Sequence, residues 1–443
     1  MKIFISSSRF DKKIVDLIVN AVVTDGHEVF HENLNIKLGD NWFKRINESI
    51  REYDAIIIIL SRDTMNSKFA LREIESIIMN DISRKSTRII PVITDKMMPP
   101  SYLMNYQYVD MSRGLNYGID KLRNILSEGT EISQRQDENI LEDNKTRNEV
   151  FIQRLKSSLM AGDLTLVCGA GVSIGAKIPS WNALLLDLLE TMIIRISNDK
   201  SVSLKPDDKN NYRSILGSSS LVMGKYLKSN LGKEFLPELR DALYRNNPQT
   251  CELINTIVEV SRPQRDGNPL NSIITFNFDA LIEENLEKHN IKYKAIDNEG
   301  NRSTPEELPI YHVHGYLPRS GKIASTKNIV FSEDSYHTQF IEPFSWSNLI
   351  QLNKLNQNTC LFIGLSLTDP NLRRLLDVAN RKDPNNNLNH FIIKKTPSLD
   401  SNNEKVDELM MFLEEQDANE LGLNVIWVNE FDEVSTLVKK LIE

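Results

Sequence analysis

The sequence predicts an α/β protein that folds as two domains, each built on a parallel sheet. Its 443 residues exceed the size that one hydrophobic core usually organises, so at least two domains are expected. From residue 2 to residue 127, short apolar runs alternate with helix-like stretches, which is typical of a parallel sheet covered by helices. A second pattern of this kind begins at the apolar run 164–168.

The first domain is expected to span residues 1–127, and its most informative segment is DAIIIIL at 54–60. Every position after the aspartate is apolar, which predicts a central strand buried on both faces. The remaining strands and helices of this domain are predicted from KIFIS, KKIVDLIVNAVV, HEVFH, WFKRINESI, REIESIIMN, RIIPVI, YQYVDM and a last helix through Ile125.

Residues 128–149 contain seven carboxylates and no aromatic side chain, a composition too polar to form a core, so we expect a linker there. The second domain is then 150–443, with a helical insertion at about 181–260. Its strands are predicted from LTLVC, NSIITFN, IYHVHG, NIVFS, NTCLFIGL, NHFIIKK and LNVIWV.

Composition excludes several classes of function. A formal net charge of −8 gives no general attraction to nucleic acid or anionic lipid. Cys168, Cys251 and Cys360 stand far apart, so they predict neither a disulfide framework nor a cysteine-rich zinc site. No apolar run approaches the ~20 residues of a membrane span. We therefore expect a cytoplasmic protein with no membrane partner and no metal.

Four ordered features carry a family resemblance in the first domain. They are FISSSRFD at 4–11, VFHENLNIKLGDNWFKRINESI at 29–50, AIIIILS at 55–61 and SKFALRE at 67–73. Together they resemble the TIR family, which implies a flavodoxin-like sheet. The last feature is similar to the family pattern S-x-W-C-x-x-E, with Phe69 for Trp and Ala70 for Cys, and it places Glu73 on the family's catalytic glutamate.

The resemblance implies that Glu73 acts in cleaving the nicotinamide N-glycosidic bond. Cleavage builds positive charge on the ribose, which a fixed carboxylate can stabilise without a metal. Phe4, Ser6, Ser8 and Arg9 are expected to line the nucleotide cleft. Two alternatives stay open at this point: Glu73 is an ordinary solvated carboxylate, or the domain is a scaffold that polymerises through the loop holding residues 39–40.

A glycine turn opens the second domain in LVCGAGVSIGAKIPSW at 166–181. Gly169 and Gly171 would let the backbone approach a pyrophosphate at the start of a helix. A glycine pair alone is weak, and Gly175 comes one residue late for the dinucleotide fingerprint. With ITFNFDALIE, YHVHG and FIGLSLTDPNL following in order, the domain resembles the sirtuin superfamily, which implies a Rossmann-like fold that binds NAD+.

Carried over residue by residue, the resemblance implies that Asn277 holds the nicotinamide ribose and a water. His314 matches the catalytic histidine, and an imidazole with a pKa of about 6.5 can accept a proton near neutral pH. His312 is either a supporting partner or a decoy. The residues expected to bind NAD+ are Gly169, Ala170, Gly171, Ser173, Pro179, Thr275, Asp279, Gly364, Ser366 and Asp369.

The sequence departs from protein-deacetylating sirtuins at two places. No cysteine lies between Cys251 and Cys360, so their four-cysteine zinc ribbon is absent. The loop KIPSWN at 177–182 keeps the proline but lacks the aspartate and arginine of G-x-P-D-F-R. These departures favour water over an acyl-lysine as the acceptor, and hence hydrolysis of NAD+ to nicotinamide and ADP-ribose.

The two resemblances together imply an NAD+-depleting enzyme similar to the sirtuin-like effectors of bacterial anti-phage systems such as Thoeris, acting by abortive infection. We expect a homo-oligomer that is triggered by a phage protein or a nucleotide signal. An alternative makes the TIR domain a sensor, an assembly module or a cyclic ADP-ribose synthase that regulates the second domain. The sequence does not decide which domain is the dominant catalyst.

Overall fold

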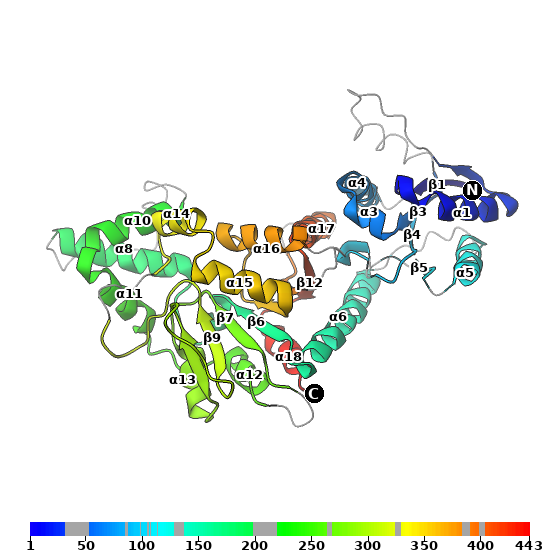
Figure 1. The fold of residues 1–443 in the computed structure, drawn as a ribbon. Coiled ribbons are helices and arrows are strands. Elements are labelled where there is room, and N and C mark those ends of the chain that lie inside the picture. The colour runs from blue at the N-terminus through cyan, green and yellow to red at the C-terminus, as the bar shows by residue number, and fades with distance from the viewer. Residues whose placement is uncertain are drawn as a thin grey trace. The chain divides into compact units, whose positions relative to one another are not determined.

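The computed structural model describes residues 1–31, 53–84, 87–97, 99–103, 106, 108–112, 114–127, 137–197, 219–263, 268–323, 329–382, 390–397 and 404–443. The predicted helix WFKRINESI and the loop at 39–40 lie outside these residues. The chain divides into two compact units, drawn in Figure 1. The first unit is Met1–Val150 with Asn380–Asn389 and Lys395–Trp427, and the second is Phe151–Ala379 with His390–Lys394 and Val428–Glu443.

The first unit contains a five-stranded sheet in the order β2-β1-β3-β4-β5. All four pairings are parallel, and this order is the flavodoxin-like one. The strands are β1 (Lys2–Ser6), β2 (Glu28–Phe30), β3 (Ala55–Leu60), β4 (Arg88–Ile93) and β5 (Val109–Asp110). The predicted central strand is confirmed, because β3 lies in the middle and every residue of it is buried.

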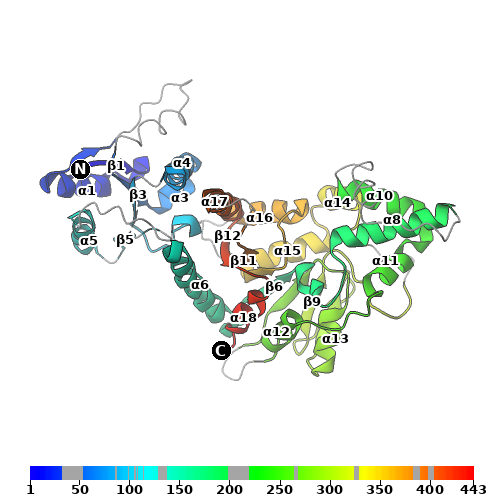
Figure 2. The same ribbon diagram turned by 180° about the vertical axis from the view of Figure 1, so that it is seen from behind.

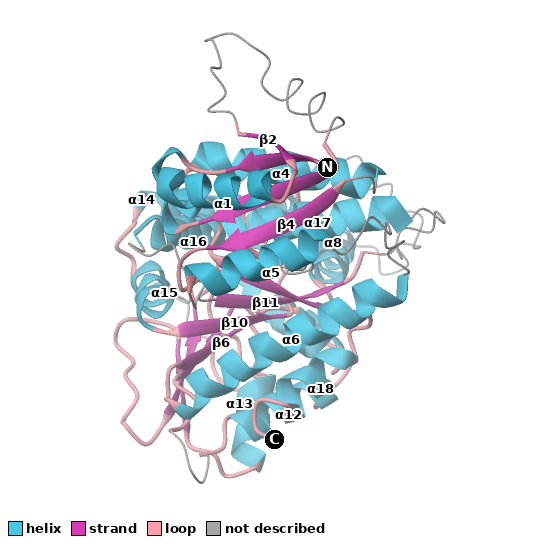
Figure 3. Ribbon diagram, turned by 90° about the vertical axis from the view of Figure 1, so that its right-hand side faces the viewer, coloured by secondary structure: helices cyan, strands magenta, loops and turns pink. Residues whose placement is uncertain are grey.

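Apolar clusters cover both faces of this sheet. On one face, side chains of α1 (Lys12–Thr24) and α5 (Leu115–Ser127) pack against the strands. On the other face lie α4 (Lys68–Arg84), the 3-10 helix η3 (Ser101–Leu103) and, through Phe412, α17 (Glu404–Glu420). Figure 3 shows these helices on both sides of the strands. Two short helices, η1 (Arg9–Asp11) and α3 (Arg62–Asn66), follow β1 and β3.

The second sheet has seven strands in the order β12-β11-β10-β6-β7-β9-β8. The pairings from β11 to β8 are parallel. The strands are β6 (Leu164–Cys168), β7 (Ser272–Thr275), β8 (Tyr293–Ile296), β9 (Leu308–His312), β10 (Thr359–Ile363), β11 (His390–Lys395) and β12 (Leu423–Val428). The order reverses direction between β6 and β10, and such a switch point is where open parallel sheets bind ligands.

Some helices of the second unit surround its sheet, and four others form a group beside it. The group contains α8 (Trp181–Ser197), α10 (Ser220–Leu231), α11 (Phe235–Tyr244) and α14 (Glu333–Ile341), which lie together in both Figure 1 and Figure 2. The other helices are α6 (Asp137–Met160), α7 (Gly171–Ile174), α12 (Glu252–Val260), α13 (Leu281–Lys288), α15 (Trp346–Gln357), α16 (Pro370–Lys382) and α18 (Glu433–Lys439). Among the described residues, no helix has the length and apolar character needed to cross a membrane.

Two features of the second sheet differ from the sequence-based prediction. The segment NIVFS was predicted as a strand, but its described residues 329–332 form none. A hydrogen bond from Val330 N–H to the carbonyl of His314 (2.8 Å) joins it to the turn beyond the end of β9. Conversely, β8 was not predicted, because its sequence YKAI mixes polar and apolar side chains in the half-buried way expected at a sheet edge.

Candidate functional site

Two loops meet at the switch point of the second sheet. The turn after β6 donates from Gly169 N–H to the Ile363 carbonyl (2.9 Å) and from Gly171 N–H to the Gly364 carbonyl (3.0 Å). A Cβ added at Gly169 would lie 2.5 Å from the Gly364 oxygen, and one at Gly171 would lie 2.7 Å from its Cα. Glycine is therefore required here by the loop-to-loop contact itself, in addition to the pyrophosphate approach that the sequence suggested.

Asn277 follows β7 and is held at both its backbone and its side chain. Its backbone N–H donates to Thr275 Oγ1 (3.1 Å), and its amide Nδ2 donates to Ser173 Oγ (3.2 Å). Ser173 in turn donates to Asp279 Oδ1 (3.3 Å). These residues are almost entirely buried, and Asn277 keeps 8% of its surface exposed. The structure thus brings together four residues that the sequence assigned to nicotinamide-ribose and NAD+ binding.

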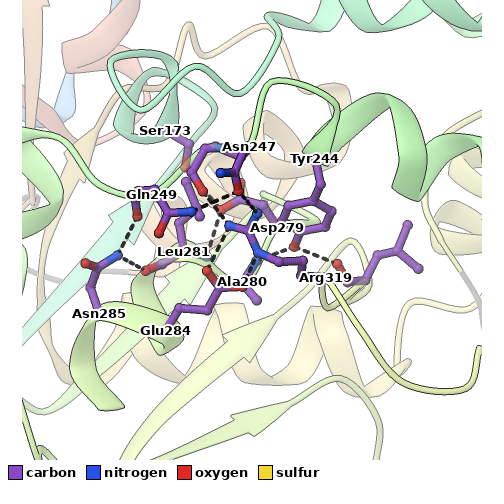
Figure 4. A network of polar contacts seen from close by, with 12 residues as sticks. Ser173, Tyr244, Asn247, Gln249, Asp279, Ala280, Leu281, Glu284, Asn285 and Arg319 are labelled. Carbon is purple, nitrogen blue, oxygen red and sulfur yellow. Dashed lines mark hydrogen bonds and ion pairs between the residues drawn. The ribbon is translucent and has the colours of Figure 1, made fainter. Parts of the chain in front are cut away.

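The loop after Asn277 is anchored to neighbouring elements, as Figure 4 shows. Asp279 Oδ1 accepts from Leu281 N–H (3.1 Å). The Tyr244 hydroxyl accepts from Ala280 N–H (2.9 Å) and donates to the Leu317 carbonyl (2.9 Å). Burial raises the pKa of Asp279 to about 6, although the hydrogen bonds from Leu281 and Ser173 oppose the rise. Asp279 is therefore a structural acceptor whose charge is sensitive to pH near neutrality.

An ion pair at the edge of the same network secures the loop that follows β9. Arg319 donates from Nε and Nη2 to the two carboxylate oxygens of Glu284, each at 3.0 Å. Its guanidinium also lies over the Tyr244 ring, 4.7 Å from the ring centroid, and donates to the Pro248 carbonyl. This bidentate geometry is the favourable one for an arginine and a carboxylate, so the loop is tied to α13 and α11.

His314 lies in the turn beyond β9 and is paired with Asp369. Its Nε2 is 3.3 Å from Asp369 Oδ2, and its ring meets the Phe276 ring edge to face at 4.7 Å. Asp369 also accepts from the Tyr336 hydroxyl (2.7 Å) and from Leu372 N–H (2.7 Å). Burial acts to raise the pKa of Asp369, but the hydrogen bond and charge interaction with His314, together with the hydrogen bonds from Leu372 and Tyr336, outweigh it, so its pKa lies below the ordinary value. Asp369 is thus an ionised partner that can orient the imidazole.

His312 has different neighbours from His314. It is the last residue of β9 and is 1% exposed. Its Nε2 lies 2.5 Å from Glu283 Oε1, and its Nδ1 lies 3.2 Å from the Asn277 carbonyl oxygen. The two histidines have different partners, because β9 ends at His312 and the chain turns before His314.

The remaining predicted NAD+-binding residues lie around the same edge. Ala170 precedes α7, and Pro179 is half-buried just before α8. Ser366 is in the loop after β10, where its hydroxyl lies 2.8 Å from Thr368 Oγ1. Tyr336 and Glu283 were not singled out from the sequence. Glu283 closes the quoted motif ITFNFDALIE, but its helix carries further acidic residues, so nothing marked it as special.

In the first unit, Glu73 on α4 is buried beside Ser6 at the end of β1. Glu73 is 8% exposed, and the Ser6 side chain forms a hydrogen bond with its carboxylate. Burial raises the pKa of Glu73 to about 7, against the lowering effect of that hydrogen bond. The solvated-carboxylate alternative is therefore not what the structure shows. A buried carboxyl with this pKa is suited to acid–base work near neutrality.

The other predicted cleft residues of the first unit have different surroundings. Phe4 is 8% exposed and packs in the apolar cluster of the sheet face that carries α4. Ser8 caps η1, accepting from Phe10 N–H, while its own N–H donates to Asp11 (3.2 Å). The side chain of Arg9 lies outside the described residues. Of this set, Ser6 is the residue that contacts Glu73.

Helix α4 carries a second buried carboxylate on its opposite face. Glu75 accepts from Gln416 Nε2 of α17 (2.9 Å), and burial together with the nearby charge of Glu420 raises its pKa to about 7. Two positions along a helix turn the side chain by roughly 200°. Glu73 therefore faces the strand while Glu75 faces α17.

These features define a class of α/β protein in which two parallel sheets each present buried polar side chains near the carboxyl ends of strands. Comparison with known families makes the class specific. The TIR domain family matches residues 3–126, and the SIR2-like domain family matches residues 271–418. The chain therefore carries a TIR domain followed by a SIR2-like domain. The second match includes Asn277 and His314, whereas the glycine turn at 169–173 precedes it.

Similar proteins are found among bacterial NAD(+) hydrolases. The chain is 23% identical over 308 residues to NAD(+) hydrolase ThsA of Enterococcus faecium, covering 66% of this chain and 58% of that protein. It is 21% identical over 305 residues to ThsA of Bacillus cereus, covering 66% and 56% respectively. ThsA of Acinetobacter baumannii is 22% identical over 316 residues, again covering 66% and 56%. The chain thus spans somewhat more than half the length of these relatives.

Proposed function

We propose that the chain is an NAD+ hydrolase that releases nicotinamide and ADP-ribose from a site in its SIR2-like domain. The observation that carries this proposal is the convergence of Asn277 and His314 on the carboxyl edge of one sheet, beside the switch point. Each has its own buried partners, Ser173 for Asn277 and Asp369 for His314. The names of the ThsA relatives support the same reaction.

The chemistry requires one bond to break and one to form. Water attacks C1′ of the nicotinamide ribose, the C1′–N bond breaks, and its electron pair neutralises the nicotinamide ring. His314 accepts the proton that the water loses, and ionised Asp369 stabilises the imidazolium. Asn277 uses Nδ2 on Ser173, which leaves its amide oxygen to accept a hydrogen bond from the water or a ribose hydroxyl.

The TIR domain offers a second candidate site. Glu73 is buried beside Ser6 with a pKa of about 7, so it exchanges its proton near neutral pH, and its ionised form would stabilise positive charge on a ribose. In this alternative the TIR domain hydrolyses or cyclises NAD+, and the SIR2-like domain responds to the product. We favour the SIR2-like site as the main catalyst, because more of its family's motifs are intact, whereas the motif that ends at Glu73 has Phe69 for Trp and Ala70 for Cys.

In the cell, the proposed role is defence against phage by depletion of NAD+. A trigger, either a phage protein or a nucleotide signal, would assemble the chain into a homo-oligomer and switch on hydrolysis. The relatives' printed names support the reaction, and the role and the trigger are our proposals.

The test uses the purified full chain with NAD+, alone and with phage lysate, and measures nicotinamide by chromatography. Asn277→Ala and Glu73→Gln are compared with two surface controls, Asn353→Ala and Glu149→Gln, which replace exposed residues of α15 and α6. We expect only Asn277→Ala to abolish release. Loss with Glu73→Gln alone would transfer catalysis to the TIR domain, and mass spectrometry would then separate linear from cyclic ADP-ribose. No nicotinamide from the wild-type chain under any condition would refute both sites.

A further inference from the structure

We propose that Glu283 and His312 form a buried, proton-sharing pair that positions Asn277 for cleavage of NAD+. This inference rests on the proposed function and extends it to two residues that are not expected to touch the substrate. His312 is 1% exposed and Glu283 2% exposed, so neither is an ordinary surface group.

The surroundings of the His312 ring show which of its nitrogens carry a hydrogen. Nδ1 lies 3.2 Å from the backbone carbonyl oxygen of Asn277. A carbonyl oxygen can only accept a hydrogen bond, so Nδ1 must carry a hydrogen. The contact therefore fixes one end of the ring as a donor to the backbone of Asn277.

The other ring nitrogen of His312 faces the carboxylate of Glu283. Nε2 lies 2.5 Å from Glu283 Oε1, too close for two lone pairs to face each other. A hydrogen must lie between them, either on Nε2 of an imidazolium or on a protonated Glu283. In both forms the pair is neutral as a whole and keeps Nδ1 protonated, which lowers the cost of burying it.

Asn277 is hydrogen-bonded at three points by its neighbours. His312 holds its carbonyl, Thr275 holds its N–H and Ser173 holds its amide nitrogen. Asn277 stands in a loop rather than in β7, so strand pairing does not fix its backbone. The Glu283–His312 pair supplies a fixed point from α13 and β9, and loss of it would let the amide oxygen move away from the reacting water.

The pair also interacts electrostatically with Asp279, which is buried and accepts a hydrogen bond from Ser173. Removing the shared proton would leave Glu283 and Asp279 as two buried carboxylates of like charge, which is unfavourable. The shared proton therefore keeps the carboxylates of this loop compatible with one another as well as orienting the ring.

Steady-state NAD+ hydrolysis by the full chain tests the proposal through paired substitutions. In Glu283→Gln the new amide can donate to Nε2 while Nδ1 still donates to Asn277, so we expect kcat to stay within about 3-fold of the wild type. In Glu283→Leu the ring loses its partner, and we expect kcat to fall about 10- to 100-fold with little change in KM. Glu287→Gln, at an exposed position on the same helix, is the matched control.

A measurement that does not depend on activity is the 15N NMR spectrum of wild-type chain labelled at its seven histidines. His312→Phe identifies the signal. We expect hydrogen on Nδ1, with or without a second on Nε2. A bare Nδ1 would overturn the inference, as would a Glu283→Leu variant with wild-type kcat or a Glu283→Gln variant as impaired as Glu283→Leu. If the wild-type chain does not hydrolyse NAD+, the proposed function is refuted. The spectrum still tests the Glu283–His312 pair in that case, because it reports whether His312 Nδ1 carries a hydrogen.

Discussion

At the scale of single residues, the contacts of Asp369 in the structure indicate a different role from the one that the sequence predicts. The sequence placed it among the residues expected to bind NAD+. In the structure its carboxylate lies 3.3 Å from His314 Nε2 and also accepts from Tyr336. An aspartate in this position fixes the orientation of a histidine and stabilises it when it gains a proton.

The substitution Asp369→Asn distinguishes a role in orienting His314 from a role in contacting NAD+. If the carboxylate orients His314, kcat should fall by about 100-fold or more, because the amide cannot stabilise an imidazolium, while KM for NAD+ stays near the wild-type value. Steady-state kinetics make this measurement, and Tyr336→Phe should give a smaller loss of the same kind. A raised KM with unchanged kcat would instead favour the ligand-contact role.

Glu73 predicts a pH dependence of stability. Its pKa rises from 4.5 in the unfolded chain to about 7 in the folded one, chiefly through burial. Between these values the folded state binds the proton more tightly, so the free energy of unfolding falls as pH increases through this window. Glu73→Gln removes the cost of burying an ionised carboxylate. The free energy of unfolding of this variant, relative to that of the wild type, should therefore rise by about 2 to 3 kcal/mol from pH 5 to pH 8. Urea unfolding at both pH values measures it, and an equal difference at each would contradict the buried carboxyl.

At the scale of elements, the loops after β6 and β10 depend on each other. Gly364 has a φ of +67°, and a Cβ added there would lie 2.7 Å from Val172 N. Gly232 has a φ of +55° but nothing within 4 Å of such a Cβ. Gly232→Ala therefore measures the cost of an unfavourable backbone conformation, about 1 to 3 kcal/mol, whereas Gly364→Ala adds to such a backbone cost a steric cost of about 1 to 3 kcal/mol.

Thermal unfolding of the two variants makes the comparison. We expect Gly364→Ala to be the less stable of the two and to bind NAD+ more weakly, because the added methyl group forces the two loops apart. Equal destabilisation by both substitutions would mean that the loops can separate without cost and that their contact does not shape the site.

Much of this element-level structure could be predicted from the sequence. The run 55–60 gave a buried central strand because all of its residues are apolar, and the motifs at Asn277 and His314 placed both residues after neighbouring strands. The segment at 329–332 looked like a strand for the same local reason, yet it forms none. Local patterns state how apolar a segment is, and they do not state whether a partner strand is available to pair with it.

The supporting residues of the site could not be predicted in this way. Glu283 sits on a helix with other carboxylates, and Tyr336 on a helix with no motif. Their roles come from contacts that join α13 to β9 and α14 to the loop after β10. Such contacts exist only in the folded chain. His312 was recognised as a partner or a decoy, and its two ring contacts now favour the partner.

At the scale of the whole molecule, the chain combines two α/β domains that each have a candidate site for the same substrate. The domain boundaries at 127 and 150 stay a prediction, as do the homo-oligomer and its trigger. The division of labour between the domains is also open to experiment, because Glu73 and Asn277 are each buried, each hydrogen-bonded and each in a family-matched segment.

The most direct test of the central claim is a crystal structure of the full-length Asn277→Ala variant with NAD+. We predict that the dinucleotide lies at the carboxyl edge of the second sheet, with its diphosphate beside the turn at 169–173 and its nicotinamide ribose within hydrogen-bonding distance of His314. NAD+ bound only in the TIR domain, or lying at the second sheet with its nicotinamide ribose directed away from His314, would contradict the account.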